Sequence, residues 1–501
     1  MSPNEARLVR NTALTVAALV LLRLVGAAWT PLTFDEAYYW IWSKHLAFGY
    51  YDHPPGVALV IRLGTMIAGD TELGVRLISI LLALPMSFAV YRTAVILFGG
   101  QRVAATATIL LNVTLMAAVG TLIVTPDAPL LVASSFVVFF LAKVLETGRG
   151  AWWLAVGAAV GLALLSKYTA MFFGPAILIW LASVPKLRRW LISPWLYLGG
   201  FVALIVFSPV ILWNADHQWV SFIKQLGRSE VVHFKPAFIA ELIPTQIAFA
   251  TPLVFVLGAM GLYALSRREG GALAARALIS AIFWTITLYF IWHSLHARVE
   301  ANWFAPVYPA FAIAAAAAAH LAQWGRTQQR VVDFCLRGAA PTGILMFAAL
   351  IAQANTGVLT GFRRDATVRS VGVGWKSLAA DIEATRARVG ASCVLAPDYG
   401  TASWLAFYLP KETCVAQPTQ RIRWINMTEP DPAKLSGRLL LVDEVRPVLI
   451  PYVRDTFNKV ERVAEFKRMR GPLVIETYGL DLLEDPKRAV LDNSPPPELS
   501  P

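Results

Sequence analysis

The sequence predicts a polytopic α-helical membrane protein with a polar α/β domain at its C-terminal end. The chain of 501 residues is 57% hydrophobic and only 15% charged, whereas soluble domains average about 25% charged residues. Apolar runs that approach the roughly 20 residues needed to cross the hydrocarbon core recur through residues 11–360. Half of the charges, 38 of 76, lie in residues 361–501, which places a domain boundary near residue 360.

The membrane domain, residues 1–360, is expected to contain about eleven spans. Each is a mainly apolar run between charged or turn-forming residues. The expected spans are 11–29, 73–98, 103–122, 128–145, 151–165, 169–184, 193–212, 245–265, 277–294, 303–323 and 339–360. Two connecting loops, 30–72 and 213–244, are long and rich in aromatic or basic residues, so they are candidates for binding a substrate at the membrane surface.

The orientation follows from basic residues that concentrate in alternate short loops. These residues are Arg7, Arg10, Arg102, Lys143, Arg149, Lys186, Arg188, Arg189, Arg267, Arg268, Arg276, Arg326, Arg330 and Arg337. The positive-inside rule makes these loops and the N-terminus cytoplasmic. With an odd number of spans, residues 361–501 lie outside, in a periplasm or lumen.

The periplasmic domain, residues 361–485, has the pattern of a small α/β unit. A charged helix is expected at 376–388 and a second helix at Thr401 to Leu409. Strands rich in Val, Leu and Ile are expected at 392–396, 438–443, 460–467 and 472–477. Cys393 and Cys414 either form a disulfide in this oxidising compartment or are two separate reduced cysteines. The proline-rich tail 486–501 is expected to be disordered.

The net charge of +12 does not indicate a nucleic-acid-binding protein, because the basic residues follow the membrane topology. The sequence also lacks the glycine-rich loops that bind nucleotides, GxxxxGK[ST] and GxGxxG between a strand and a helix. This absence from the sequence argues against ATP-driven transport.

The strongest functional candidate is the acidic pair Asp35 and Glu36, which follows the first span and opens an aromatic segment. Carboxylates at membrane depth must be hydrated, paired with a cation or hydrogen-bond donor, or engaged in binding or catalysis. One of them is expected to act as a general base or to orient an acceptor. A solvated loop start or a helix N-cap is the alternative interpretation.

A second polar motif in the same loop contains Tyr51, Asp52 and His53, followed by two prolines. The prolines restrict the backbone and hold the preceding histidine in place. His53 is therefore expected to contact a phosphate or to move a proton. An ordinary turn is the alternative.

Two further candidates lie at span ends. Asp127 begins the 128–145 run and either caps that helix or binds sugar hydroxyls. Lys167 and Tyr168 interrupt a hydrophobic hairpin, where a lysine is costly unless it reaches water or an anion. A lipid-linked phosphate is the expected anion, and snorkelling to the interface is the alternative.

The segment after the 277–294 span contains Arg298, Glu300 and Asn302, preceded by His293 and His296. Arg298 has the planar fork of donors that suits a phosphate. His293, His296 and Glu300 have a spacing that a metal site would also use, although the same spacing is common by chance. A solvated turn is the default interpretation.

These motifs resemble the GT-C superfamily of glycosyltransferases that use polyprenyl-phosphate sugars. The similar groups are bacterial relatives of protein O-mannosyltransferases, of the lipid A aminoarabinose transferase and of lipid A-core galacturonosyltransferases. The resemblance rests on Asp35-Glu36 with the aromatics that follow, on Asp52-His53-Pro54-Pro55, and on Asp127. Further motifs are Ser166 to Thr169, Arg298 to Trp303, and Asp398 to Pro410. Where the aminoarabinose transferase has a lysine before the proline pair, this chain has His53, which argues against aminoarabinose as the sugar.

The resemblance implies a GT-C fold and an inverting transfer of one sugar from a polyprenyl phosphate to an envelope acceptor. That acceptor would be lipid A or its core, another glycan, or a protein. The implied catalytic residues are Asp35, Glu36 and Asp127. The implied donor-binding residues are Tyr51, Asp52, His53, Lys167, Tyr168, Arg298, Glu300 and Asn302. No cofactor is implied, and a divalent metal near Asp35 and Asp127 stays an open alternative.

Two other functions remain as alternatives. A ligase or polymerase would use a lipid-linked oligosaccharide as donor, so donor size separates it from a single-sugar transferase. A lipid or sugar transporter would usually show repeated halves with broken helices at mid-membrane. The sequence shows no such internal symmetry, and its polar motifs gather on one face.

Overall fold

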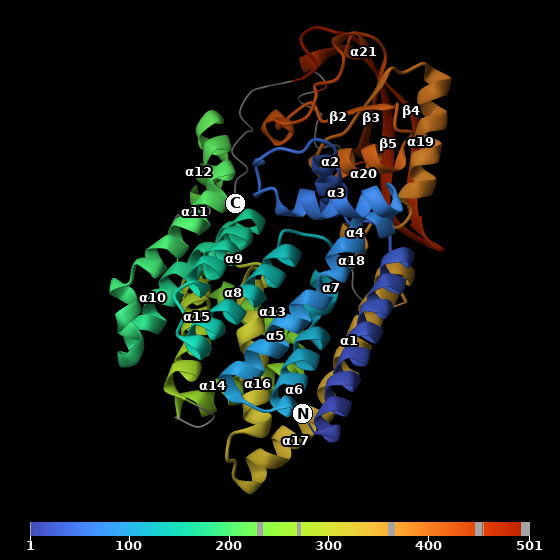
Figure 1. Ribbon diagram of the computed structural model, residues 1–501. Helices are drawn as coiled ribbons and strands as arrows, with labels where there is room; N and C mark the ends of the chain where they lie inside the picture. Colours follow the sequence, from blue (N-terminus) through green and yellow to red (C-terminus); the bar gives the residue numbers. More distant parts are fainter. Residues whose placement is uncertain are drawn as a thin grey trace. The chain divides into compact units, whose positions relative to one another are not determined.

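The computed structural model describes residues 2–227, 234–267, 272–358, 366–445, 453 and 455–491 (Figure 1). The chain forms two compact units. The helical unit comprises Met1–Gly26, Asp52–Gly64 and Arg76–Ala348. The sheet unit comprises Ala27–Tyr51, Thr65–Val75 and Ala349–Pro501. Part of the first long loop thus belongs to the same unit as the C-terminal domain.

The helical unit is built from α-helices with three interspersed 3-10 helices, some of which continue across a unit boundary. In chain order they are α1 (Pro3–Trp29), α3 (Gly56–Ala68), α4 (Glu72–Leu81), α5 (Ala83–Phe98), α6 (Gln101–Val113), α7 (Leu115–Gly120), α8 (Asp127–Thr147), α9 (Trp152–Ser166), η1 (Tyr168–Phe172), α10 (Phe173–Ser183), η2 (Pro185–Ile192), α11 (Pro194–Asp216), α12 (Val220–Gly227), α13 (Ala237–Phe249), α14 (Pro252–Ser266), α15 (Leu273–His293), η3 (Ala301–Val307), α16 (Tyr308–His320) and α17 (Arg326–Thr356).

The sheet unit combines helices with one mixed sheet. Its elements are α2 (Phe34–Lys44), α18 (Ala366–Ser370), α19 (Trp375–Val389), β1 (Cys393–Leu395), α20 (Tyr399–Tyr408), β2 (Cys414–Ala416), η4 (Arg421–Trp424), α21 (Pro432–Leu435), β3 (Leu439–Glu444), β4 (Phe457–Arg470) and β5 (Leu473–Pro486).

The helical unit confirms a multi-pass membrane protein, although not the predicted number of eleven spans. Within the described residues, seven helices are long and apolar enough to cross a membrane, or eight if the bent pair α13 and α14 counts as one span. That pair turns by 103° at Thr251, whose φ is +66°, before Pro252. Since both halves are apolar, the sequence shows one run where the backbone makes a corner. The predicted spans 151–165 and 169–184 correspond to shorter apolar helices.

Small residues let the membrane helices approach closely. A Cβ on Gly157 of α9 would lie 2.0 Å from the Gly199 carbonyl oxygen of α11, and one on Gly261 of α14 would lie 1.9 Å from the Ala314 oxygen of α16. Such contacts replace the hydrophobic driving force that helices lack in lipid. A buried Arg23 in α1 also donates to the Asn112 carbonyl of α6 at 2.7 Å.

The five strands of the sheet unit are ordered β2-β1-β3-β5-β4. Strand β1 runs parallel to β2 and β3, whereas β5 runs antiparallel to β3 and β4. Helix α19 lies along β4 (Figure 1). The predicted helices and four strands of this region are confirmed, and β2 is an additional strand. A disulfide joins Cys393 and Cys414, which face each other on β1 and β2.

The segment before α2 is held to the C-terminal part of the sheet unit by backbone contacts. Thr33 forms an antiparallel bridge with Val371. The Leu32 carbonyl accepts hydrogen bonds from the Gly372 backbone at 2.8 Å and from the Trp404 indole at 3.0 Å. These bonds fix where α2 begins, and therefore fix the acidic pair.

Candidate active site

Helix α2 begins with a capping box that uses one of the two acidic residues. The Thr33 hydroxyl accepts from the Glu36 backbone at 3.2 Å, and the Glu36 carboxylate accepts from the Thr33 backbone at 2.9 Å. Glu36 is fully buried. Its carboxylate therefore starts the helix, as the helix-capping interpretation expects, rather than facing a substrate.

Asp35 is the half-buried member of the pair, in the first turn of α2. The Tyr399 hydroxyl, at the start of α20, donates to its Oδ1 at 3.1 Å. Tyr399 is held in turn by the rings of Phe34 and Tyr38, with centroids 5.9 and 5.0 Å away. The carboxylate thus has a fixed orientation and stays partly accessible, as a general base must.

A cation lies against the aromatic rings around Asp35, and these residues together form the Asp35 cluster. The Arg423 guanidinium sits 4.4 Å from the Tyr399 ring centroid and 5.6 Å from the Tyr51 ring centroid. The Tyr38 hydroxyl donates to the Arg423 carbonyl at 3.1 Å. Tyr51, predicted to bind the donor, therefore belongs to the Asp35 cluster of the sheet unit. No local pattern in the sequence indicates Arg423.

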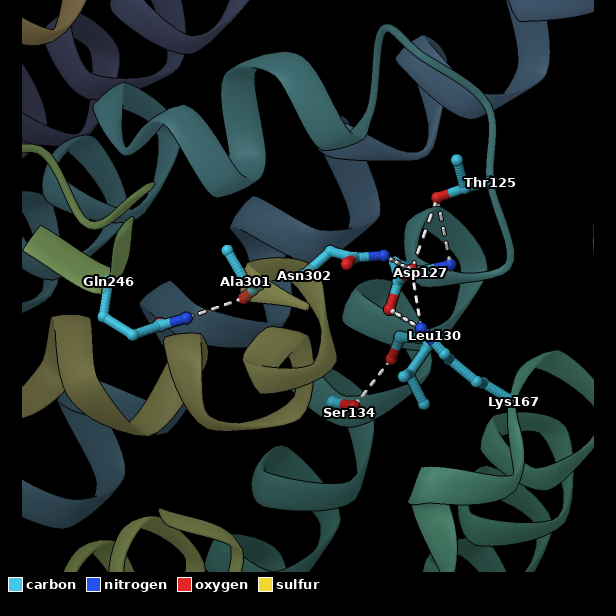
Figure 2. A network of polar contacts seen from close by, with 8 residues as sticks. All are labelled: Thr125, Asp127, Leu130, Ser134, Lys167, Gln246, Ala301 and Asn302. Carbon is cyan, nitrogen blue, oxygen red and sulfur yellow. Dashed lines mark hydrogen bonds and ion pairs between the residues drawn. The ribbon is translucent and has the colours of Figure 1, made fainter. Parts of the chain in front are cut away.

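The second cluster lies in the helical unit and is centred on Asp127 (Figure 2). The Lys167 ammonium donates to both carboxylate oxygens of Asp127, at 2.7 and 2.8 Å. The Asn302 amide donates to Oδ2 at 2.6 Å, and the Thr125 hydroxyl is 3.5 Å from the same oxygen. Asp127 is 1% exposed and Lys167 is 6% exposed. Two predicted site residues, Lys167 and Asp127, thus form a buried ion pair, and a third, Asn302, donates a hydrogen bond to it.

Lys167 reaches Asp127 because α9 ends one residue earlier. Its backbone is extended, with φ −157° and ψ 142°, between α9 and η1. Gly56, at the start of α3, packs against this turn, where a Cβ would lie 2.8 Å from the Leu165 oxygen. Gly56 follows the proline pair, so the end of this motif lies directly against the turn that carries Lys167.

Helix α12 of the second long loop contacts two of the other predicted residues. The Asp52 side chain pairs with Lys224, and its carbonyl accepts from the Gln225 amide at 2.9 Å. The Tyr168 hydroxyl is 2.7 Å from the Ser221 hydroxyl. Asp52 and Tyr168 therefore both position α12. Two other basic residues of this loop, Arg228 and His233, lie outside the described residues.

The remaining predicted donor-binding residues lie nearer the surface of the helical unit. His53 is partly buried beside Asp52. Arg298 is exposed and pairs with Glu241 of α13. Glu300 is exposed and precedes η3. The Glu241 partner was not predicted, because nothing in the sequence links positions 57 residues apart.

The alternative metal site finds no support in the donor set. Across the described ranges, no three His, Cys, Asp or Glu side chains come together as metal ligands. His293 instead packs its ring against Tyr289 and Trp303, with centroids 5.9 Å away in each case.

The fold and the two clusters define a multi-pass membrane protein with polar residues placed at helix ends. Residues 52–213 match the dolichyl-phosphate-mannose-protein mannosyltransferase family. The chain is also 26% identical over 317 residues to the lipid A galacturonosyltransferase RgtD of Rhizobium johnstonii. That alignment covers 61% of this chain and 65% of the relative's length.

Solved structures show the same fold. ArnT from Cupriavidus metallidurans, bound to undecaprenyl phosphate, matches with a TM-score of 0.64 and 18% identity, over 93% of this chain and 97% of ArnT. The oligosaccharyltransferase of Archaeoglobus fulgidus matches with a TM-score of 0.52 and 13% identity, over 88% of this chain and 70% of that one. The predicted resemblance is confirmed at the level of fold: the chain has the fold of the GT-C glycosyltransferases.

Proposed function

We propose that this protein is a membrane glycosyltransferase that moves a single sugar from a polyprenyl phosphate to an envelope acceptor. The observation that carries the proposal is the Asp35 carboxylate, partly exposed at the start of α2 and oriented by Tyr399, in a chain of GT-C fold. The polyprenyl donor is supported by the undecaprenyl phosphate bound to ArnT. A lipid A acceptor is supported by the likeness to RgtD.

The proposed reaction inverts the configuration at the sugar. Asp35 takes the proton of an acceptor hydroxyl while the oxygen of that hydroxyl attacks the anomeric carbon. The bond from that carbon to the phosphate oxygen breaks, and the polyprenyl phosphate leaves with the electron pair. Basic side chains, Arg298 and the remaining N–H of Lys167, neutralise the charge that develops on the phosphate. Glu36 acts by fixing the helix start, and Asp127 by holding Lys167.

An apolar cavity of about 490 Å³ in the helical unit suits part of the polyprenyl tail. It lies between α13, α14, α15, η3 and α16, with walls that include Phe255, Phe283 and Phe311. Gln246, which also lines it, donates to the Ala301 carbonyl at 2.9 Å (Figure 2). Ala301 precedes Asn302, which binds Asp127. The apolar cavity and the charged cluster are therefore joined through η3, as a lipid-phosphate site requires.

We place the reaction on the periplasmic face of a bacterial inner membrane. The basic cytoplasmic loops support this orientation. The Cys393–Cys414 disulfide also supports it, because such bonds persist in oxidising compartments.

The proposed reaction needs no cofactor, because the leaving phosphate meets basic side chains. Turnover is expected to survive treatment with a metal chelator. Loss on chelation and recovery with a divalent ion would instead assign a metal to the carboxylates.

The test is to measure intact masses of envelope glycolipids from cells that lack the protein and carry either wild type or Asp35→Asn. A one-sugar increment is expected with wild type alone, since losing such a group costs roughly 100-fold or more in rate. Asp381→Asn, an exposed position on α19, is the control and should retain the increment. Full activity of Asp35→Asn would remove Asp35 from the mechanism.

Two results would favour the other functions. An increment of several sugars would indicate a ligase or polymerase. Unchanged glycolipids and glycoproteins would favour a transporter.

A further inference from the structure

A second cavity lies wholly within the sheet unit and is separate from the Asp35–Tyr399 contact. Its volume is about 230 Å³, and it lies between the last turn of α2, helix α20 and the segment from Lys411 to Pro430. Pockets for drug-sized ligands are typically roughly 300–1,000 Å³. This cavity therefore suits an occupant of about one sugar ring.

The wall of this cavity is basic. Among its described lining residues are Lys44, His45, Lys411 and Arg421, and no Asp or Glu side chain. Two carboxylates that are not among the lining residues offset part of this charge. Asp70 lies 2.5 Å from the Lys44 ammonium and also interacts electrostatically with Lys411, and the exposed Glu429 pairs with Arg421.

Lys411 is the cation best placed to meet a solute. It is exposed, and its ammonium lies 4.3 Å from the Trp40 ring centroid and donates to the Phe407 carbonyl at 2.8 Å. An ammonium has three donors, so others remain for an incoming anion.

Two buried donors in the wall also lack acceptors. The Trp424 indole, which can only donate, gives its hydrogen to Gln417 Oε1 at 2.9 Å. This bond fixes the amide orientation and leaves Gln417 Nε2 as a donor. Within the described part of the chain, neither Nε2 of Gln417, which is 1% exposed, nor Nε of Arg421 meets an acceptor. Both atoms are fully covered by protein, so they add to the positive potential of the wall rather than meet a ligand directly.

We propose that this cavity binds an anionic saccharide, a single sugar ring that carries a carboxylate or a phosphate. The lining cations recognise the anionic group, and Thr413 and Thr428, which also line the cavity, offer hydroxyls to the ring. The assignment of the occupant to a saccharide of the acceptor rests on the proposed function. The expectation that the cavity binds an anion does not rest on it.

The test uses the full-length protein in nanodiscs without donor, with binding followed by saturation-transfer NMR. Galacturonate and glucose 6-phosphate are the probes, galactose and glucose are their neutral partners, and inorganic phosphate is the anion without a ring. At least one anionic sugar should bind at least about tenfold more tightly than its neutral partner, since a charged hydrogen bond typically contributes roughly 1.5–3 kcal/mol. The two probes distinguish a carboxylate from a phosphate ligand.

Substitutions locate the binding. Lys411→Gln should weaken binding of the preferred probe about tenfold or more, and Lys411→Arg should restore most of it. Gln417→Glu keeps an acceptor for Trp424 but adds a negative charge beside the cavity, so it should also weaken binding of an anion. Lys434→Gln, an exposed lysine of α21, is the matched control and should change nothing.

Three outcomes would overturn the inference: equal binding of neutral and anionic sugars, inorganic phosphate binding as tightly as the sugars, or Lys411→Gln and Lys434→Gln behaving alike. The inference and the proposed function fail separately. Asp35→Asn should lose transfer yet bind the probe like wild type, because the cavity binds without the reaction.

Discussion

Replacing Lys167 with methionine tests the buried charge cluster around Asp127. The ammonium donates to both Asp127 oxygens, and the two side chains are only 8% and 2% exposed. Methionine is a similarly long, unbranched side chain that donates no hydrogen bond. Asp127 would then keep its charge and the 2.6 Å bond from Asn302, but lose its counter-ion.

The expected loss follows from this geometry. Removing one partner of a buried ion pair costs about 3–5 kcal/mol, because the other charge stays buried. The hydrogen bond from Asn302 remains and partly stabilises the carboxylate. For Lys167→Met we therefore expect a loss in the free energy of unfolding at the lower end of this range, about 3 kcal/mol. In the double variant with Asp127→Asn no charge is buried, and the loss should fall to about 1 kcal/mol.

The free energy of unfolding in mixed micelles would be measured for wild type, both single variants and the double variant. Lys143→Met is the control, since Lys143 pairs with the exposed Glu146 three residues on in α8. Such surface pairs contribute about 0.3–0.5 kcal/mol. Two results would refute a buried ion pair between Lys167 and Asp127. One is a loss of stability in the double variant equal to the sum of the two single losses. The other is an equal loss of stability for Lys167→Met and Lys143→Met.

Two further predictions concern ionic contacts that are less buried than the Lys167–Asp127 pair. Arg298→Gln should raise the KM for the polyprenyl-phosphate donor roughly tenfold. Glu241→Gln, which removes the carboxylate paired with Arg298, should leave this KM unchanged or lower it. Both values are measured from initial rates at increasing donor concentration, and a higher KM in both variants would assign the pair a structural role. The bidentate bonds from Arg386 lower the pKa of Glu383. Because the folded-state pKa is depressed, this contribution is present above about pH 4.3 and is lost as pH falls through the lower folded value. Denaturant unfolding from pH 6 to 3 should show a shallower decline in Glu383→Gln, and identical pH profiles would contradict this.

The sequence predicts the longer helices and strands of this fold better than it predicts its short strand β2 or the bend between α13 and α14. The strands β3 and β5 follow from runs of Val, Leu and Ile, whose side chains favour a pleated surface. Strand β2, only three residues long, was missed because it exists through parallel pairing with β1, 21 residues away. The corner at Thr251 was missed because both flanking helices are equally apolar.

At the candidate site the sequence identifies residues but not partners. The pair Lys167 and Asp127 lies 40 residues apart, and Asn302 lies 175 residues from Asp127, so no local pattern relates them. The capping role of Glu36 was readable, since Thr33 followed three residues later by Glu is the capping-box signature. The acidic pair therefore divides into one structural and one candidate catalytic carboxylate by a local rule.

The ion pairs of the helical unit differ in how readily they yield a cation to a phosphate. The side chains are 8% and 2% exposed in Lys167–Asp127, 14% and 11% in Lys224–Asp52, and 61% and 42% in Arg298–Glu241. An exposed pair is worth about 0–1 kcal/mol, so a phosphate displaces Glu241 at little cost. Displacing Asp127 would leave a buried carboxylate and cost several kcal/mol. In the proposed reaction we therefore expect Arg298 to exchange its partner for the phosphate, and Lys167 to keep Asp127 and share only its remaining N–H.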